Sequence, residues 1–199
     1  MRTRDRLKNS IMGKLYTELD DKLIKFIEIQ KIFFVSTAPD EGRINLSPKG
    51  METFSVSDKN SAAFLNLTGS GNETATHLAI NPRITIMFCS FDKTPMILRL
   101  YGKGRVITPY QEEWKSWISK FKDYPGARQI ITIDIESVQT SCGFAVPLAE
   151  SITERDTLEK WAKQKNEDAL KSYWKEKNSI SLDGYPTHVL PNVQTKEEQ

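Results

Sequence analysis

Two short segments carry side chains of the types that hold a phosphorylated small molecule. The first runs from Arg43 to Gly50 and has the pattern of a strand, in which alternate side chains point to opposite faces. Two cations beside two hydrogen-bonding groups suit a phosphate or the polar edge of a heterocycle. The alternative is an ordinary strand whose polar face meets water. The polar face is predicted to present Arg43, Asn45, Ser47 and Lys49.

The second segment, Asn66 to Thr74, reads as a strand that passes through a Gly/Ser turn into a helix start. Ser70 stands three residues before Glu73, which is the spacing of a capping box. A helix start offers free backbone N–H groups and a positive dipole end, so it favours an anion. The Glu73 carboxylate would compete for the same donors, and a merely well-capped helix is therefore the alternative. The candidate residues here are Asn66, Thr68, Ser70, Gly71, Asn72 and Thr74.

The elements that must position these residues are mostly short strands without regular helices between them. Such spacing predicts a mainly β fold, an antiparallel barrel with peripheral helices. We expect strands at about 32–37, 43–50, 52–57, 62–68, 83–91, 96–108 and 128–139. We expect helices at about 18–30, with Thr17 and Asp20 at N-cap spacing, at 71–80, around Trp114–Phe121, and along Leu158–Trp174.

Composition excludes several classes of function. The 28 Lys and Arg residues nearly balance the 26 Asp and Glu residues, so the net charge of +2 gives no reason to expect nucleic-acid binding. No apolar run approaches the roughly 20 residues that a membrane-spanning helix needs. The first ten residues are charged and no apolar signal core follows them, which predicts a cytoplasmic protein. Cys89 and Cys142 lie far apart and form no metal or redox motif.

The 199 residues are expected to form one domain, because no repeat or Pro/Gly/Ser-rich linker divides them. We expect residues 1–13 to be mobile and 14–30 to form an N-terminal helix. The barrel core is expected at 31–148, a C-terminal helical extension at 149–183, and an irregular tail at 184–199.

Four segments in this order resemble the pyridoxamine 5′-phosphate oxidase-like family. They are Arg43–Gly50, Phe64–Thr74, Asn81–Thr85 and Leu98–Gly104, within a resemblance that spans about residues 20–145. No single motif is specific, whereas the ordered set is. The resemblance implies a six-stranded antiparallel split β-barrel with flanking helices. It also implies bound FMN and a homodimer in which each flavin lies between two subunits.

The chain departs from this family at three places. The family's oxidases carry an Arg-Lys pair at the start of the short helix to grip the flavin phosphate, and Glu73-Thr74 stands there instead. A Gln that contacts the flavin falls at Ile97. The family's C-terminal substrate segment with Trp and Arg has no counterpart beyond Ser141–Pro147. FMN binding by an altered site is therefore expected, and oxidation of pyridoxamine phosphate is not.

The resulting hypothesis is an FMN-binding oxidoreductase that acts on a small molecule. Asn45 and Asn66 would face the flavin ring, and Arg99 could reach the ring or the partner subunit, with a surface ion pair as its alternative. No Ser/His/Asp set, paired carboxylates or metal cluster is evident, and no catalytic residue is assigned. A flavin-, deazaflavin- or haem-binding sensor on the same fold is the alternative. The phosphate and ribityl chain would be held by Arg43, Ser47, Lys49, Thr68, Ser70 and Asn72.

Overall fold

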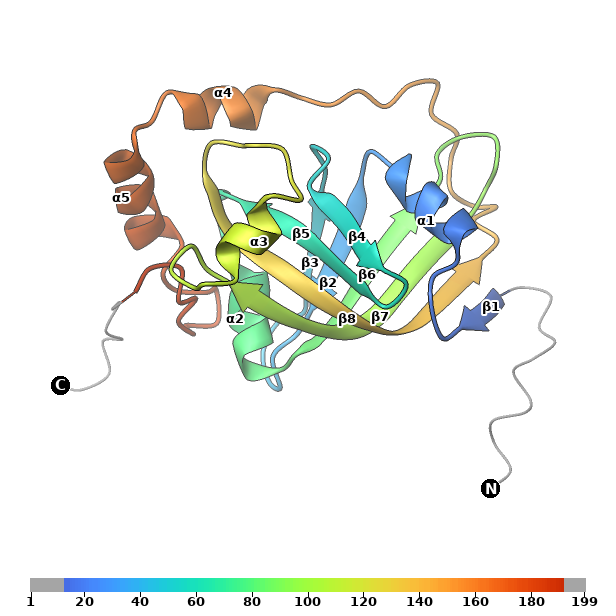
Figure 1. The fold of residues 1–199 in the computed structure, drawn as a ribbon, viewed down its shortest axis with the longest axis horizontal. Coiled ribbons are helices and arrows are strands. Elements are labelled where there is room, and N and C mark those ends of the chain that lie inside the picture. The colour runs from blue at the N-terminus through green and yellow to red at the C-terminus, as the bar shows by residue number, and fades with distance from the viewer. Residues whose placement is uncertain (1–12, 192–199) are drawn as a thin grey trace.

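The computed structural model describes residues 13–191, which are built on one curled antiparallel sheet (Figure 1). The strand path runs β3-β2-β6-β7-β8-β5-β4, and β1 pairs with β8 off this path. The path ends at β3 and β4, so the barrel stays open along that side. The strands are β1 Gly13–Tyr16, β2 Phe33–Thr37, β3 Asn45–Lys49, β4 Phe54–Asp58, β5 Ser61–Leu67, β6 Arg83–Cys89, β7 Ile97–Ile107 and β8 Ala127–Ser141.

This architecture confirms the expected mainly β, antiparallel split barrel, but the sheet has eight strands rather than six. The length of β8 explains the unexpected strand β1. Strand β5 covers β8 only as far as Asp134, so the backbone of the last part of β8 would be left without a partner on that side. Residues 13–16 fill this edge by pairing with residues 138–141.

Two of the helices have bounds that differ from those expected from the sequence. The N-terminal helix starts at residue 21 rather than 14, because residues 13–16 are strand. Asp20 caps it as expected, accepting a 2.8 Å hydrogen bond from the Leu23 N–H. The expected long C-terminal helix is two helices, since Asn166 caps a new one by accepting from the Ala169 N–H at 2.9 Å. The helices are α1 Asp21–Glu28, α2 Glu73–Ile80, α3 Trp114–Ile118, α4 Thr157–Lys163 and α5 Glu167–Lys177.

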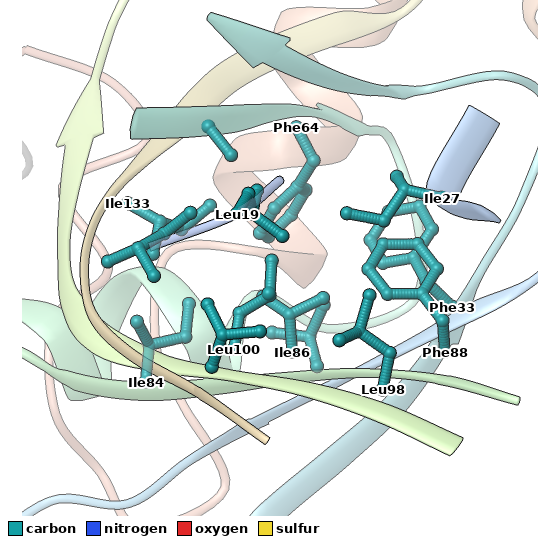
Figure 2. Close-up of a cluster of buried hydrophobic side chains, with 14 of the residues drawn as sticks. Leu19, Ile27, Phe33, Phe64, Ile84, Ile86, Phe88, Leu98, Leu100 and Ile133 are labelled. Atoms are coloured by element: carbon teal, nitrogen blue, oxygen red, sulfur yellow. The ribbon is translucent and has the colours of Figure 1, made fainter. Parts of the chain in front are cut away.

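The barrel encloses an apolar core to which α1 and most of the strands contribute (Figure 2). Phe33 lies at its aromatic centre, with ring centroids 5.1 Å from Phe54 and 5.7 Å from Phe64, both in edge-to-face geometry. Helices α4 and α5 arch around the outside of the barrel and bring the chain back beside α2 (Figure 1). The core therefore fixes the strand ends, and the C-terminal extension returns to them.

The structure tests only part of what was expected of the two chain ends. Residues 1–12, expected to be mobile, and residues 192–199 of the expected tail lie outside the described residues. Residues 184–191 form no helix or strand apart from an isolated bridge between Ile180 and Pro186. Within residues 13–191, no helix has the length and apolar character to cross a membrane. Cys89 is buried and Cys142 is exposed, and both are free thiols.

Helix α2 is held against the sheet by close contacts on β7 and β2. A Cβ added at Gly104 of β7 would lie 2.9 Å from the Leu78 methyl groups, so the helix packs directly on bare backbone. His77 makes a 3.1 Å hydrogen bond to the Thr37 hydroxyl of β2. These contacts fix the direction of α2 and thereby the place where it starts.

A β-bulge interrupts the pairing of β7 with β8 at Gly102. The pairing register between β7 and β8 shifts between Tyr101 and Gly102. A Cβ at Gly102 would lie 2.0 Å from the Asp134 carbonyl oxygen, a distance that no side chain tolerates. Only glycine therefore fits here without moving a strand.

We expect Gly102→Ala to lower the free energy of unfolding by about 3 kcal/mol, because the new methyl group meets backbone that cannot move aside. Urea denaturation at fixed temperature measures this change. Gly69→Ala is the matched control, since a Cβ at Gly69 meets nothing within 4 Å, and it should change stability by less than about 1 kcal/mol. Equal stability of the two variants would contradict the bulge assignment.

Candidate functional site

The two segments predicted to hold a phosphate meet at the open side of the barrel. Lys49 lies at the end of β3 and Asn66 near the end of β5, and the Lys49 Nζ is 3.5 Å from the Asn66 Oδ1. They border a cavity of about 610 Å³, within the usual range for a small-molecule site. Eight of the eleven predicted site residues line it: Asn45, Ser47, Lys49, Asn66, Ser70, Gly71, Asn72 and Thr74.

A buried arginine that the sequence analysis missed lies at the centre of this cavity wall. Arg128 of β8 is 2% exposed, and its Nη2 donates a 2.7 Å hydrogen bond to the Gly71 carbonyl. Its Nε and Nη1 are buried without a hydrogen-bond partner among the described residues. A guanidinium with two unsatisfied donors calls for an acceptor that the described chain does not supply.

A register shift in the sheet brings Arg128 to the cavity. Asn66 pairs with Gln129, but Leu67 pairs with Ala127, so Arg128 is an extra residue in a β-bulge. Without the bulge, neighbouring residues of β8 would face opposite sides of the sheet. With it, Gln129 contacts Asn66 while Arg128 lines the same cavity. Strict alternation could not predict this, and the only sequence signal was two polar residues before the apolar run of β8.

Electrostatics make this cavity suited to an anion. Burial, together with the smaller effect of the nearby Arg128 charge, lowers the pKa of Lys49 to about 8. Burial also lowers the pKa of Arg128 to about 10, against a small opposing influence of Tyr173. Among residues 13–191, neither cation forms an ion pair with a carboxylate. The cavity thus holds two partly desolvated positive charges beside each other.

The start of α2 faces the cavity without a side-chain cap, which corrects the expected capping box. Asn72 rather than Ser70 occupies the N-cap position, and it makes no capping hydrogen bond. Arg128 donates to the Gly71 carbonyl and so holds the turn that contains Ser70. This turn precedes the N-cap residue Asn72, and Ser70 is therefore not the cap. The Glu73 carboxylate also lines the cavity, but both its oxygens accept from the Leu182 N–H at 3.2 Å rather than from an N–H of the helix. The positive end of the helix is left available to a ligand.

Amide and hydroxyl groups at the cavity form two small hydrogen-bond networks, one centred on Asn66 and one on Asn45. The Asn66 amide donates to Asn72 at 3.0 Å and to Gln129 at 3.2 Å. The Asn45 amide donates to the Thr74 hydroxyl at 3.2 Å and accepts from the Ser47 hydroxyl at 3.1 Å. These bonds hold the side chains in fixed orientations, so the polar wall is formed before any ligand arrives.

Three predicted site residues make other contacts within the described chain. Arg43 precedes β3 rather than continuing its alternation, and it pairs with Asp183. Thr68 is buried between two partners, donating to the Gly126 carbonyl at 2.7 Å and accepting from the Trp174 indole N–H at 2.8 Å. Arg99 lies on β7 and donates to the Ser141 hydroxyl at 3.1 Å.

A second, mostly apolar cavity of about 660 Å³ adjoins the first. Both are lined by Pro48 and Lys49, so they meet at the end of β3. The far wall comes from the C-terminal extension, including Ile152, Leu158 and Trp161. The structure therefore places a cationic cavity beside an apolar one.

Comparisons with known proteins agree with this architecture. A family model described as "Pyridoxamine 5'-phosphate oxidase" matches residues 19–142. A pyridoxamine 5′-phosphate oxidase family protein, ustO of Aspergillus flavus, is 41% identical over 193 residues, covering 88% of this chain and 78% of that protein. A Lactobacillus delbrueckii crystal structure, described by the same oxidase name, has a TM-score of 0.52 and 16% identity, covering 64% and 98% of the two chains. The chain belongs to the pyridoxamine 5′-phosphate oxidase family.

Proposed function

We propose that the cationic cavity binds FMN by its phosphate and that the protein is an FMN-dependent oxidoreductase acting on a small molecule. One observation carries this proposal, namely the buried Arg128 guanidinium, two of whose nitrogens have no partner within the described part of the chain, beside the half-buried Lys49. A phosphate supplies both the negative charge and the acceptors that this pair lacks. Membership of an oxidase family that binds FMN makes a flavin phosphate the best candidate.

The residues of the cavity divide into groups that suit the parts of FMN. Arg128, Lys49 and the uncapped start of α2 would hold the phosphate. Ser47 and Asn72 offer hydrogen bonds to the ribityl hydroxyls, and the Asn45 and Asn66 amides, which the sequence analysis assigned to the flavin ring, line the same cavity. FMN, when bound, supplies the transfer of a hydride or electrons, while the protein binds and orients it. The adjoining apolar cavity gives room for a ring or a small apolar substrate.

We expect purified protein to bind FMN stoichiometrically, with the shifted absorption of a bound flavin. Arg128→Met should weaken FMN binding at least tenfold, because it removes charge-assisted hydrogen bonds to the phosphate. Riboflavin, which lacks the phosphate, should bind equally to both proteins. Arg105→Met is the control, since Arg105 is exposed and pairs with Glu113 away from the cavity. Calorimetric titration measures the affinities of the wild type and both variants for FMN and riboflavin.

A colourless protein that rejects added FMN would overturn the cofactor proposal and favour a binding role for deazaflavin or haem. If FMN binds, a nicotinamide nucleotide added without oxygen tests the oxidoreductase half. Bleaching of the flavin absorption supports a reductase. If the bound flavin stays oxidised with both nicotinamide nucleotides, the protein is a passive flavin-binding protein rather than a reductase.

Affinity for FMN should fall about tenfold between pH 7 and pH 9. The pKa of Lys49 in the free protein is about 8, so its amine is mostly charged at pH 7 and mostly neutral at pH 9. The phosphate itself stays fully ionised across this range, since its second pKa is about 6. In Lys49→Met the profile should become flat, with weaker binding at pH 7. An unchanged slope in this variant would show that another group titrates.

We also propose a homodimer that buries the outer face of strand β3. Ile44, just before β3, and Leu46, on β3 at the edge of the sheet, are 75% and 65% exposed beside the site. Leu46→Glu should shift the protein from dimer to monomer in light scattering after gel filtration. Leu15→Glu, on exposed strand β1, is the control and should leave the dimer intact. A wild-type monomer at micromolar concentration would refute the proposal.

A further inference from the structure

A short C-terminal hairpin, residues 178–187, closes one side of the cationic cavity. Its two arms meet at the bridge between Ile180 and Pro186, and the Ser181 N–H donates to the Tyr185 carbonyl at 2.8 Å. The arm from Ile180 to Leu182 lines the cavity. This wall lies outside residues 19–142, the part that the family model matches.

The base of this hairpin is firmly attached to the barrel. Asn178 is fully buried, and its amide donates to the Gly69 carbonyl at 3.0 Å. Trp174, one turn earlier in α5, donates to Thr68. Thr187 closes the base by donating to the Asn178 carbonyl. The buried contacts tie the hairpin to the same Gly/Ser turn that borders the cavity.

The tip of the hairpin is held differently, by contacts at the surface. The Leu182 N–H reaches the Glu73 carboxylate, and the Leu182 side chain is 77% exposed. The Asp183 carboxylate accepts from the Arg43 N–H at 2.8 Å and pairs with the Arg43 guanidinium; the Arg43 side chain is 70% exposed, whereas the Asp183 side chain is 12% exposed. Gly42 makes room for this docking, since a Cβ there would lie 2.7 Å from the Asp183 carboxylate.

The two ends of the hairpin therefore differ in how easily they can open. The tip contacts have at least one exposed partner, Arg43 or Leu182, and ion pairs that water can reach contribute little to stability, whereas the buried hydrogen bonds of the base are costly to break. Segments with few buried contacts open locally while the rest of the fold stays intact. The hairpin has the construction of a flap with a fixed base and a weakly latched tip.

We propose that the C-terminal hairpin is a gate over the anion site, and that Glu73 and Asp183 are positioning residues that latch it. The tip opens to admit a phosphate-bearing ligand and closes behind it. Glu73, standing where the family's oxidases carry an Arg, thus serves the gate instead of the phosphate. The gate rests on the proposed function only in that its ligand carries a phosphate.

Hydrogen exchange of the full chain, followed by mass spectrometry, tests the gate directly. In Asp183→Ala the amides of residues 180–185 should exchange at least threefold faster, while the barrel strands and the unfolding midpoint stay unchanged. Inorganic phosphate should slow exchange of the hairpin in the wild type. Glu167→Ala is the control, since Glu167 pairs only with Lys171 on α5. If neither phosphate nor Asp183→Ala changes the amide exchange rates of the hairpin, the gate proposal is wrong.

Stopped-flow mixing with FMN adds a kinetic measurement. Asp183→Ala should raise both the association and the dissociation rate constants several-fold, so that the dissociation constant changes less than either. A purely structural role would lower affinity or stability without raising the association rate, and that result refutes the gate. If phosphate protects the hairpin but FMN does not bind, the FMN proposal fails while the gate stands.

Discussion

The site depends on a buried guanidinium that the fold satisfies at only one of its three nitrogens among the described residues. Arg128 donates to the Gly71 carbonyl and so fixes the turn before α2. Its other two nitrogens are desolvated without partners in residues 13–191, and burial beside the Arg128 charge lowers the pKa of Lys49. Desolvating an ion costs on the order of several kcal/mol, and an anion in the cavity would offset that cost for both cations. Arg128 therefore both fixes the turn before α2 and presents buried N–H groups that an anionic ligand would satisfy.

The opening of the barrel makes room for these charges. Strands β3 and β4 end the sheet path, and side chains rather than backbone bonds bridge the gap, as Lys49 does to Asn66. The turn between the end strands holds Met51 and Glu52 at φ of 62° and 54°, which costs about 1 kcal/mol or more for each residue. The Tyr124 hydroxyl donates to the Met51 carbonyl and steadies this turn. A closed barrel would have filled this space with ladder hydrogen bonds and left no cavity.

Most of the strands and much of the site followed from local sequence patterns. Alternation along β3 correctly placed Asn45, Ser47 and Lys49 on one face, because that strand is regular. Alternation failed for Arg128, since a bulge is a tertiary feature that shifts the side-chain phase. The capping box failed at Ser70 because contacts from β8 and from the C-terminal hairpin determine where α2 begins and where Glu73 points. Local rules thus held within elements and failed where distant segments compete for the same groups.

The start of α2 carries an acidic residue, Glu73, where the family's oxidases carry a basic one, and this difference links the preceding observations. The family's oxidases are expected from the resemblance to carry an Arg-Lys pair there, which would grip a phosphate from the start of α2. In this chain the cations that line the cavity include Lys49 of β3 and Arg128 of β8, and the Glu73 carboxylate, at the cavity edge, accepts from the Leu182 N–H. Buried cations are less screened by water and salt than surface ones, so fewer charges are needed for the same attraction. A ligand needs a route into this cavity. The Glu73 carboxylate, which does not hold the phosphate, instead accepts from the Leu182 N–H of the C-terminal hairpin that lines the cavity.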